Sequence, residues 1–446
     1  MVSRKVLIIT GDSIAPAMAG PGIRALQLGA VIGASHNVRV VTTGDFAPID
    51  TDIFVEKTSK RQLREHANWA DIILFQGFIL AQYPWLKYSN ALLVADLYDP
   101  LHLEQLEDTH SDQIESRSKS IRSTVAAITE QLRYADFIIC ASEKQRDFWL
   151  GYLSALGRVN PANYVQDSSL RELISVVPFG ISDEDPVQKH SGIRGVIPGI
   201  SQNDFVLLWG GGIYNWFDPL TLIQAVHQVS ATHPEVKLFF MGIAHPNPMF
   251  TEYSMSDKAI QLSEQLGTRN KHVFFNESWV PFEERANFLL DANVGVSTHF
   301  VHLETAFSFR TRLLDYLWAG LPIIATEGDT FAPIIEHHQL GLVVDENNLQ
   351  SCVNAIITMI ENQHLRETYS RNVSNIRERF RWSRVAQPLL AFVERGNHSA
   401  DYQRPVENIP LHVTREYWLV GKIRGAKIAL NEGGFQLVIR KLTGRA

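Results

Sequence analysis

The sequence contains little of what would place it among disulfide-bonded, membrane-spanning or nucleic-acid-binding proteins. Its 446 residues include only two cysteines, Cys140 and Cys352, which excludes a disulfide scaffold or a cysteine-based zinc site. Both lie in apolar runs, so we expect buried, reduced thiols. No apolar stretch approaches the ~18 residues of a membrane span, and residues 6–9 are too few for a signal peptide's apolar region. The net charge of −7 argues against a broadly basic nucleic-acid binder. These absences predict a cytoplasmic protein, either free or attached to the inner face of the membrane.

What is present is the composition of a soluble globular chain, with 45% hydrophobic and 20% charged residues. Short apolar runs alternate with longer segments of helical periodicity and fall into two sets of six. The first set is 5–10, 37–43, 71–76, 90–96, 136–141 and 174–178, and the second is 204–211, 235–241, 271–276, 293–298, 322–326 and 341–344. Such nearly continuous apolar runs indicate buried parallel strands, in sheets covered by helices on both faces.

A segment rich in proline, glycine, serine and charge, residues 182–203, separates the two sets and is typical of a linker. We therefore predict an N-terminal domain over 1–181 and a C-terminal domain over 204–375. A closing helix over 376–395 returns to the first domain, and a polar segment and basic tail follow over 396–446. Ligands of such sheets bind beyond the carboxyl ends of the strands, so the cleft between the domains is the expected site.

A glycine-containing segment follows the first strand of the N-terminal domain. Gly20 and Gly22 precede an expected helix, and Arg24 lies just inside it. A helix N-terminus offers free backbone N–H groups and a positive dipole end, which suit a phosphate. A tight turn without a ligand is the alternative, and Arg24 favours an anion.

The C-terminal domain opens in the same way, with Gly210, Gly211 and Gly212 directly after a strand. Three consecutive glycines are entropically costly, which favours close approach of the backbone to a ligand. Asp218 is expected to cap a helix whose first residue is Pro219.

The densest chemical pattern lies in residues 298–329. A helix is predicted to begin near Ser308, which places Arg310 and Arg312 in its first turn. Arginines at a helix N-terminus oppose the helix dipole, so their presence there favours a bound anion such as a diphosphate. Asp315 lies three residues beyond Arg312, and an ordinary ion pair between the two is the alternative to a binding role.

In this region the sequence resembles a known family. The string LLDYLWAGLPIIAT (313–326) looks like the "EAMAAGLPVVAT" segment of GT-B glycosyltransferases, specifically the large retaining family four, or group 1. Further matching segments occur in the family's order. They are VVPFGI (176–181), VLLWGGGI (206–213), SWVPFEER (278–285) and RFRWSRVAQPLLAFVE (379–394). The resemblance implies an α/β GT-B fold with two Rossmann-like, doubly wound domains and an inter-domain cleft.

The resemblance also implies roles for individual positions. The family's glutamate that holds the donor ribose corresponds to Asp315, whereas its other glutamate, eight residues earlier, corresponds to Phe307. Glu304 is the nearest acid and a candidate substitute. The family's basic residues that neutralise the leaving diphosphate are absent after the glycine loop, so Arg310 and Arg312 are the candidate replacements.

Other family positions complete the expected site. Trp279 and Val280 would line the nucleobase pocket, and the donor-binding set also includes Phe309 and Thr311, which flank Arg310.

The family places a cleft-facing histidine or aspartate after the fourth strand of the first domain, where Asp99 and His102 stand here. Either could contact the sugar or accept the acceptor proton. A solvated histidine at a helix start is the alternative for His102. The acidic string 183–185 lies in the linker and is interpreted as solvated charge rather than a metal site.

Together these features predict a retaining glycosyltransferase that moves a hexose from a nucleotide sugar, UDP-glucose above others, to a glycan or lipid-linked saccharide acceptor in polysaccharide synthesis. No metal or cofactor is expected, because arginines and helix N-termini serve the diphosphate. A nucleotide-sugar epimerase on the same fold and a catalytically degenerate nucleotide-sugar-binding subunit are the alternatives.

The tail over 413–446 carries seven basic and two acidic residues among apolar ones. This pattern predicts docking on an anionic membrane surface, with packing on the first domain as the alternative.

Overall fold

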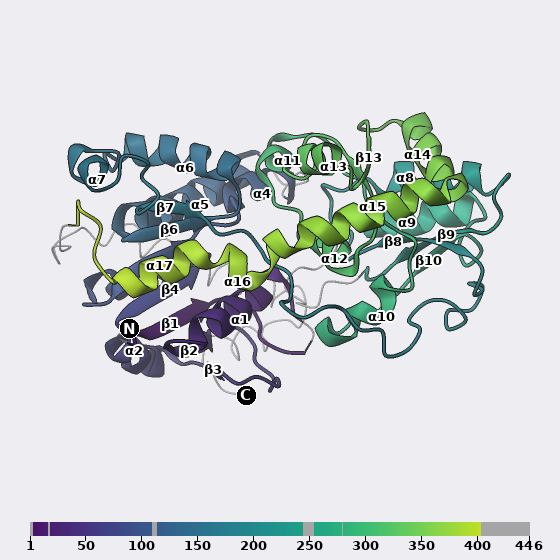
Figure 1. The fold of residues 1–446 in the computed structure, drawn as a ribbon. Coiled ribbons are helices and arrows are strands. Elements are labelled where there is room, and N and C mark those ends of the chain that lie inside the picture. The colour runs from purple at the N-terminus through teal and green to yellow at the C-terminus, as the bar shows by residue number, and fades with distance from the viewer. Residues whose placement is uncertain (1–2, 17, 109–113, 244–253, 279, 403–446) are drawn as a thin grey trace, which may run out of the picture.

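The computed structural model describes residues 3–16, 18–108, 114–243, 254–278 and 280–402. Two parallel β-sheets lie side by side, each covered by helices on both faces (Figure 1). The first sheet has the strand order β3-β2-β1-β4-β5-β6-β7, and the second has the order β10-β9-β8-β11-β12-β13. In each sheet the order reverses direction beside its first strand in the chain, so both sheets are doubly wound. The predicted fold class, two Rossmann-like α/β domains, is confirmed.

The first sheet consists of β1 (Lys5–Thr10), β2 (Asn37–Thr42), β3 (Phe54–Lys57), β4 (Ile72–Gln76), β5 (Leu92–Asp96), β6 (Phe137–Cys140) and β7 (Ile174–Val176). Its helices are α1 (Gly20–Gly33), α2 (Lys60–Trp69), α3 (Ile79–Gln82), η1 (Pro84–Tyr88), α4 (Leu101–Asp108), α5 (Ile114–Tyr134), α6 (Glu143–Ala155) and α7 (Pro161–Gln166). All six strands predicted in this half are present. The edge strand β3 was not predicted, because none of its four residues is fully buried and it lacks an apolar run.

The second sheet consists of β8 (Phe205–Trp209), β9 (Val236–Phe240), β10 (Val273–Phe275), β11 (Val294–Ser297), β12 (Ile323–Thr326) and β13 (Gly341–Val344). The helices around it are α8 (Pro219–Val229), α9 (Ser254–Gln265), η2 (Phe282–Glu284), α10 (Arg285–Leu289), α11 (Leu303–Phe307), α12 (Thr311–Ala319), α13 (Ala332–His338), α14 (Leu349–Glu361) and α15 (Gln363–Ile376). Every strand predicted for this half is present. Cys140 and Cys352 are free and buried, as expected.

The chain crosses between the domains twice, and the two crossings run side by side. Ile181 exchanges backbone hydrogen bonds with Phe380 (2.8 Å) and Trp382 (3.0 Å). The predicted closing helix is broken into η3 (Arg377–Phe380), α16 (Trp382–Val385) and α17 (Gln387–Arg395). Helix α17 packs on the first domain, where Phe392 stacks on Phe137 at 4.7 Å (Figure 1).

The acidic string of the linker is exposed to solvent, as expected, and two of its carboxylates also pair with the returning chain. Asp185 forms ion pairs with Arg377 (2.9 Å) and Arg381 (2.8 Å) from the second crossing. Asp183 accepts hydrogen bonds from Ser383. These carboxylates therefore join the linker to the returning chain.

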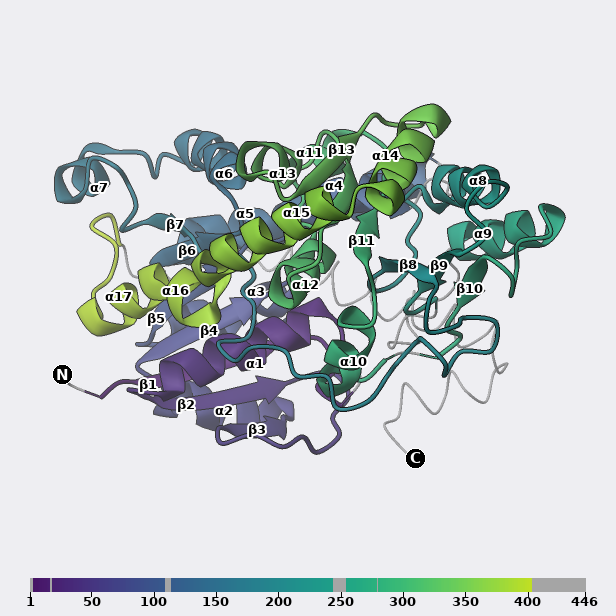
Figure 2. The same ribbon diagram turned by 45° about the vertical axis from the view of Figure 1, so that its right-hand side comes forward.

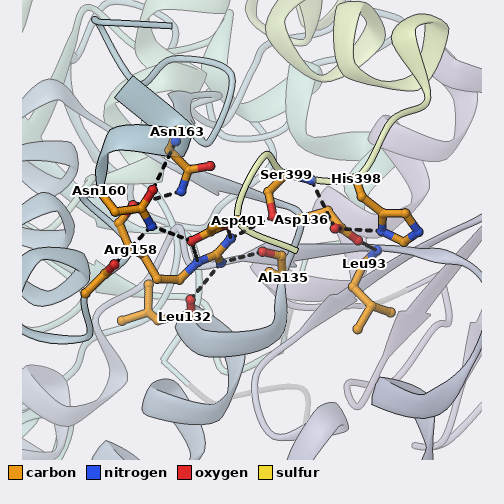
Figure 3. Close-up of polar contacts among 11 residues, drawn as sticks. Leu93, Leu132, Ala135, Asp136, Arg158, Asn160, Asn163, His398, Ser399 and Asp401 are labelled. Carbon is orange, nitrogen blue, oxygen red and sulfur yellow. Dashed lines mark hydrogen bonds and ion pairs between the residues drawn. The ribbon is translucent and has the colours of Figure 1, made fainter. Parts of the chain in front are cut away.

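The chain beyond α17 is fixed to the first domain by a polar network (Figure 3). Arg158 donates to both carboxylate oxygens of Asp401, at 2.8 and 3.1 Å, and to Ser399. The carboxylate of Asp136 accepts from the ring of His398 (2.9 Å). Arg158 and Asp136 are both buried. A chain that ended before His398 would remove Asp401 from Arg158 and His398 from Asp136, which is costly for buried charges.

Helix α12 is attached to the second sheet by one buried tyrosine. The Tyr316 hydroxyl lies 3.0 Å from the Leu208 carbonyl and 2.8 Å from that of Val296, and it accepts from the Gly210 N–H at 2.8 Å. The ring occupies the space above Gly295, where a Cβ atom would stand 2.3 Å from the ring carbons. No helix in the described part of the chain has the length and apolar character needed to cross a bilayer.

Candidate functional site

The carboxyl ends of strands from both sheets face each other where α4 of the first domain contacts α11 of the second. Figures 1 and 2 show these two helices next to each other. Strand β5 leads to Asp99 and α4, whereas β11 leads to α11 and α12. The candidate site is therefore assembled from strand ends and short loops of both domains, where ligands of doubly wound sheets bind.

Asp99 is a first-domain carboxyl group whose pKa is influenced by charges of the second domain. Burial and the negative charge of Glu304 raise the pKa of its carboxyl to about 6, while Arg310 and a hydrogen bond with Glu104 act in the opposite direction. The structure thus brings together Asp99, Glu304 and Arg310, which the sequence predicted separately. A carboxyl group of this kind is ionised at neutral pH and can accept a proton.

Glu304 and Arg310 form a buried, two-pronged ion pair. Arg310 Nη1 and Nη2 lie 3.1 and 2.8 Å from the two carboxylate oxygens, and both side chains are only 6% exposed. Arg310 is therefore neutralised within the protein, and Glu304 is not a free acid that replaces the one missing at Phe307. Arg310 also precedes α12, which begins at Thr311 rather than near Ser308 as predicted.

Arg312 is different, because no carboxylate pairs with it among the described residues. Its Nη2 donates to the Gly212 carbonyl at 2.8 Å, and its guanidinium lies over the rings of Trp209 (4.6 Å) and Phe217 (3.9 Å). Its Nη1 is buried without a partner. Burial lowers the pKa of Arg312 to about 10. This is a buried cation directly beside the glycine loop.

The three glycines after β8 have different surroundings. Gly210 packs against Tyr316, and a Cβ atom on Gly212 would lie 3.2 Å from the Tyr214 ring. Gly211 has φ +79°, and nothing lies within 4 Å of the position of an added Cβ. Its conformation favours glycine and its space is open, which suits backbone approach to a ligand.

The helix after this loop begins as predicted. Asp218 accepts a hydrogen bond from the Thr221 N–H at 3.0 Å, and Pro219 is the first residue of α8.

Five buried side-chain atoms without hydrogen-bond partners belong to the end of β11 and to the segments after β11 and β12. They are Ser297 Oγ, His299 Nδ1, Arg310 Nε, Arg312 Nη1 and Asp329 Oδ2. Folded proteins leave few buried polar atoms unsatisfied, so this concentration at one sheet edge points to a polar ligand.

His299 and Asp329 were missed in the sequence, although His299 directly follows one predicted strand and Asp329 lies three residues beyond another. The His299 Nε2–H donates to the Glu327 carbonyl at 3.1 Å, and burial together with the charge of Arg310 lowers its pKa to about 3. Its Nδ1 is therefore a lone-pair acceptor. Asp329 Oδ1 accepts from the backbone N–H groups of Phe331 and Ala332, both at 2.8 Å. A search of the residues that follow strand ends would have found both.

Asp315 pairs with Arg285, not with Arg312. Arg285 Nε lies 3.2 Å from Asp315 Oδ1, and burial raises the pKa of this carboxyl. The Asp315 side chain remains 30% exposed, so a ligand can reach it.

The structure contradicts the predicted role of Arg24 and the predicted position of Gly20 and Gly22 before α1. Arg24 is fully buried and donates to both carboxylate oxygens of Asp96, at 2.7 and 2.9 Å, so it cannot bind a phosphate. Gly20 and Gly22 lie inside the first turn of α1 rather than in a loop before it. A Cβ atom on Gly22 would stand 2.7 Å from the Ser13 carbonyl oxygen, which gives this glycine a packing reason.

His102 lies in an aromatic cluster, which excludes the solvated alternative. Its ring stacks on Phe148 at 5.7 Å, and burial lowers its pKa. Phe307 packs against the same Phe148 at 5.0 Å. The position of the missing family acid is therefore occupied by a contact between the domains.

The remaining predicted residues are less central to this edge. Val280 is buried in the apolar core, Phe309 packs against Phe331 at 4.8 Å, and Thr311 is exposed. Trp279 lies outside the described residues. Within the described part of the chain, no three His, Cys, Asp or Glu side chains are grouped so that they could hold a metal ion.

Comparison with known proteins identifies the second domain. Residues 197–376 match the family model described as glycosyl transferases group 1. A phosphatidyl-myo-inositol mannosyltransferase of Mycobacterium leprae is 26% identical over 87 residues, which is 20% of this chain and 23% of that protein. The match therefore spans less than a quarter of the curated relative.

Solved structures with similar folds cover most of this chain. Sucrose-phosphate synthase from Thermosynechococcus elongatus has a TM-score of 0.62 at 16% identity, covering 88% of this chain and 98% of that one. Anabaena HepE, in complex with UDP-glucose, has a TM-score of 0.62 at 16% identity, covering 88% and 100%. The expected GT-B fold is confirmed, and the second domain is a group 1 glycosyl transferase domain.

Proposed function

We propose that this chain, a GT-B protein with a group 1 glycosyl transferase domain, is a retaining glycosyltransferase that moves a hexose from a nucleotide sugar to a glycan or lipid-linked saccharide. UDP-glucose is the favoured donor, since the structurally similar Anabaena protein was solved with that molecule. The reaction requires a diphosphate to leave and an acceptor hydroxyl to lose its proton.

The observation that carries this proposal is the unpaired Arg312 beside the glycine loop. A buried cation that forms no ion pair is costly, and a diphosphate supplies the missing partner. The interaction strengthens as the bond to the sugar breaks and negative charge grows on the leaving oxygen, so Arg312 stabilises the transition state more than the ground state. Arg310, which the sequence analysis gave the same role, already has Glu304 as its partner.

The other residues of the edge supply complementary contacts. The partly buried carboxylate of Asp315 accepts from the ribose hydroxyls, and His299 Nδ1 and Asp329 Oδ2 accept from hydroxyls of the donor. Asp99 approaches from the first domain and contacts the sugar or accepts the proton of the acceptor hydroxyl. Arginine and backbone N–H groups serve the diphosphate, so the proposed reaction uses no metal ion.

The donor can be identified by thermal unfolding with UDP-, GDP-, ADP- and dTDP-sugars. A donor at 100 times its Kd stabilises the folded state by about 2.7 kcal/mol. Arg312→Met should abolish this stabilisation, while Gln131→Glu, a substitution at a buried first-domain residue that has no part in the proposed donor site, should keep it. If no nucleotide sugar stabilises the wild-type protein, the proposal fails.

Product analysis separates transfer from the two alternatives. An epimerase converts the donor sugar without an acceptor, whereas a glycosyltransferase forms a new glycosidic bond only when the acceptor is present. A degenerate binding subunit, which the phenylalanine at position 307 favours, binds the donor without turnover.

We also propose that residues 413–446, which lie outside the described part of the chain, dock the protein on anionic lipid. A chain ending at Tyr402 keeps Asp401 and its partner Arg158. It should remain folded and no longer sediment with phosphatidylglycerol vesicles at low salt. Unchanged sedimentation of the shortened protein would contradict this proposal.

A further inference from the structure

One buried side chain of the first domain connects directly to the loop that carries the second domain's charged residues. This is Gln145, in the first turn of α6, and it is fully buried. We infer that Gln145 is a positioning residue for the proposed transfer, fixing the Asp99 loop of the first domain against the α11–α12 loop of the second. The inference concerns the arrangement of the domains and depends on the proposed function only for its kinetic consequence.

Both N–H groups and the carbonyl oxygen of the Gln145 amide are hydrogen-bonded. Its Nε2 donates to the Tyr98 carbonyl at 2.9 Å and to the Phe307 carbonyl at 2.8 Å. Its Oε1 accepts from the Ala141 N–H at 2.8 Å. Tyr98 immediately precedes Asp99, so one amide group connects the backbone beside Asp99 to the backbone at the end of α11.

The side chains around this amide also join the two domains. The Phe307 ring packs on the Phe148 ring, with 5.0 Å between the ring centroids. The Lys144 ammonium lies over the Phe307 ring, 5.3 Å from its centroid. One face of α6 therefore contacts Phe307 through a hydrogen bond, an aromatic pair and a cation. Each contact would be lost if the domains moved apart.

The position of Gln145 predicts which kinetic constant changes. Arg312, His299, Asp315 and the glycine loop all belong to the second domain, and Gln145 contacts none of their side chains. Loss of the amide should leave donor binding to the second domain intact. Transfer should slow, because Asp99 is no longer held at a fixed distance from the reacting sugar.

The first test replaces Gln145 by glutamate, which has the same shape but cannot donate to two carbonyls when ionised. We expect kcat for transfer to fall about tenfold or more, since two buried hydrogen bonds are lost, while the donor Kd changes by less than about twofold. Gln131→Glu is the matched control. Gln131 is also buried, but its Nε2 donates at 2.7 Å to the Gly77 carbonyl within the first domain. Gln131→Glu should lower thermal stability about as much as Gln145→Glu does, and it should leave kcat within about twofold of the wild-type value.

The second test does not require activity. Spin labels on Asn68→Cys in α2 and Gln228→Cys in α8 would report the distance between the domains, since both positions are exposed and the native cysteines are buried. Without any ligand, the distribution of distances between the two labels should be narrow in the otherwise wild-type protein. It should be broad in Gln145→Glu and narrow again in Gln131→Glu.

The outcomes separate this inference from the proposed function. Equal distance distributions in all three backgrounds would overturn it, whatever the activity. It would also be overturned if kcat fell equally in Gln145→Glu and the Gln131→Glu control. A broadened distribution in a protein that shows no donor turnover would support the inference and reject the proposed function.

Discussion

Arg312→Met should separate stability from function, because this arginine is unpaired until the ligand arrives. Methionine keeps much of the length and apolar volume of the side chain but removes the charge. In the ligand-free protein, burial lowers the pKa of Arg312 from 12.5 to about 10, which corresponds to a cost of about 3 kcal/mol for the charged form. The two aromatic contacts and the hydrogen bond to Gly212 offset this cost by roughly 2–4 kcal/mol in total.

These two contributions nearly cancel. We therefore expect the free energy of unfolding of the ligand-free variant to lie within about 1 kcal/mol of the wild-type value, although a buried arginine has been removed. Donor turnover should behave very differently. Removing a preorganised donor to developing negative charge costs about 10²-fold or more in kcat. The expected result is a variant that folds normally and turns over the donor at about a hundredth of the wild-type rate or less.

Urea unfolding of the ligand-free protein, thermal unfolding with and without UDP, and steady-state kinetics measure the three quantities. Stabilisation by UDP should disappear in Arg312→Met. A loss of more than about 3 kcal/mol in the absence of ligand, together with an unchanged response to UDP, would show that Arg312 is a structural core residue. The anion site would then have to be sought elsewhere on the same edge.

Five further outcomes are expected. Arg310→Met should cost about 3–5 kcal/mol in urea unfolding because Glu304 would remain buried and unpaired, and adding Glu304→Gln should recover most of that loss. Asp315→Asn should raise the donor KM with a smaller change in kcat, whereas equal losses in both would place this residue at the reacting sugar. Since Asp99 has a raised pKa of about 6, kcat/KM should rise with pH through that value, and Asp99→Asn should abolish this limb. Because the pKa of Asp99 is higher in the folded than in the unfolded protein, ionisation of this carboxyl disfavours folding. The wild-type protein should therefore lose about 1–3 kcal/mol of stability relative to Asp99→Asn as the pH rises from about 4 to above 6, measured by urea unfolding at each pH. Activity should survive EDTA, and a loss restored by Mg²⁺ would contradict the assignment of the diphosphate to Arg312.

The fold was largely predictable because most of its strands are buried on both faces. Such strands need unbroken apolar runs, and all twelve predicted runs became strands. The strand β3 escaped because an edge strand needs no such run, and its sequence FVEK carries two charges. The break in the closing helix was also missed, since the backbone at the break is hydrogen-bonded to Ile181, which is about 200 residues away in the sequence.

The candidate site was only partly predictable, because a sequence pattern gives a residue's position but not its partner. Arg24 stands where a phosphate ligand would be expected, yet its partner Asp96 lies 72 residues away in the sequence. Arg310 and Arg312 looked equivalent at the start of one helix. Only the structure of the turn between α11 and α12 shows that Glu304 neutralises Arg310 and not Arg312.

The tyrosine beneath α12 limits how this domain can diverge. Tyr316 fills the volume that a side chain at position 295 would need, and its hydroxyl accepts the N–H of Gly210. A lineage that acquires alanine at position 295 must therefore first lose the large ring at 316, and with it the bond that holds the glycine loop. Substitutions at these positions should appear in pairs among descendants of this sequence, and single changes should be rare.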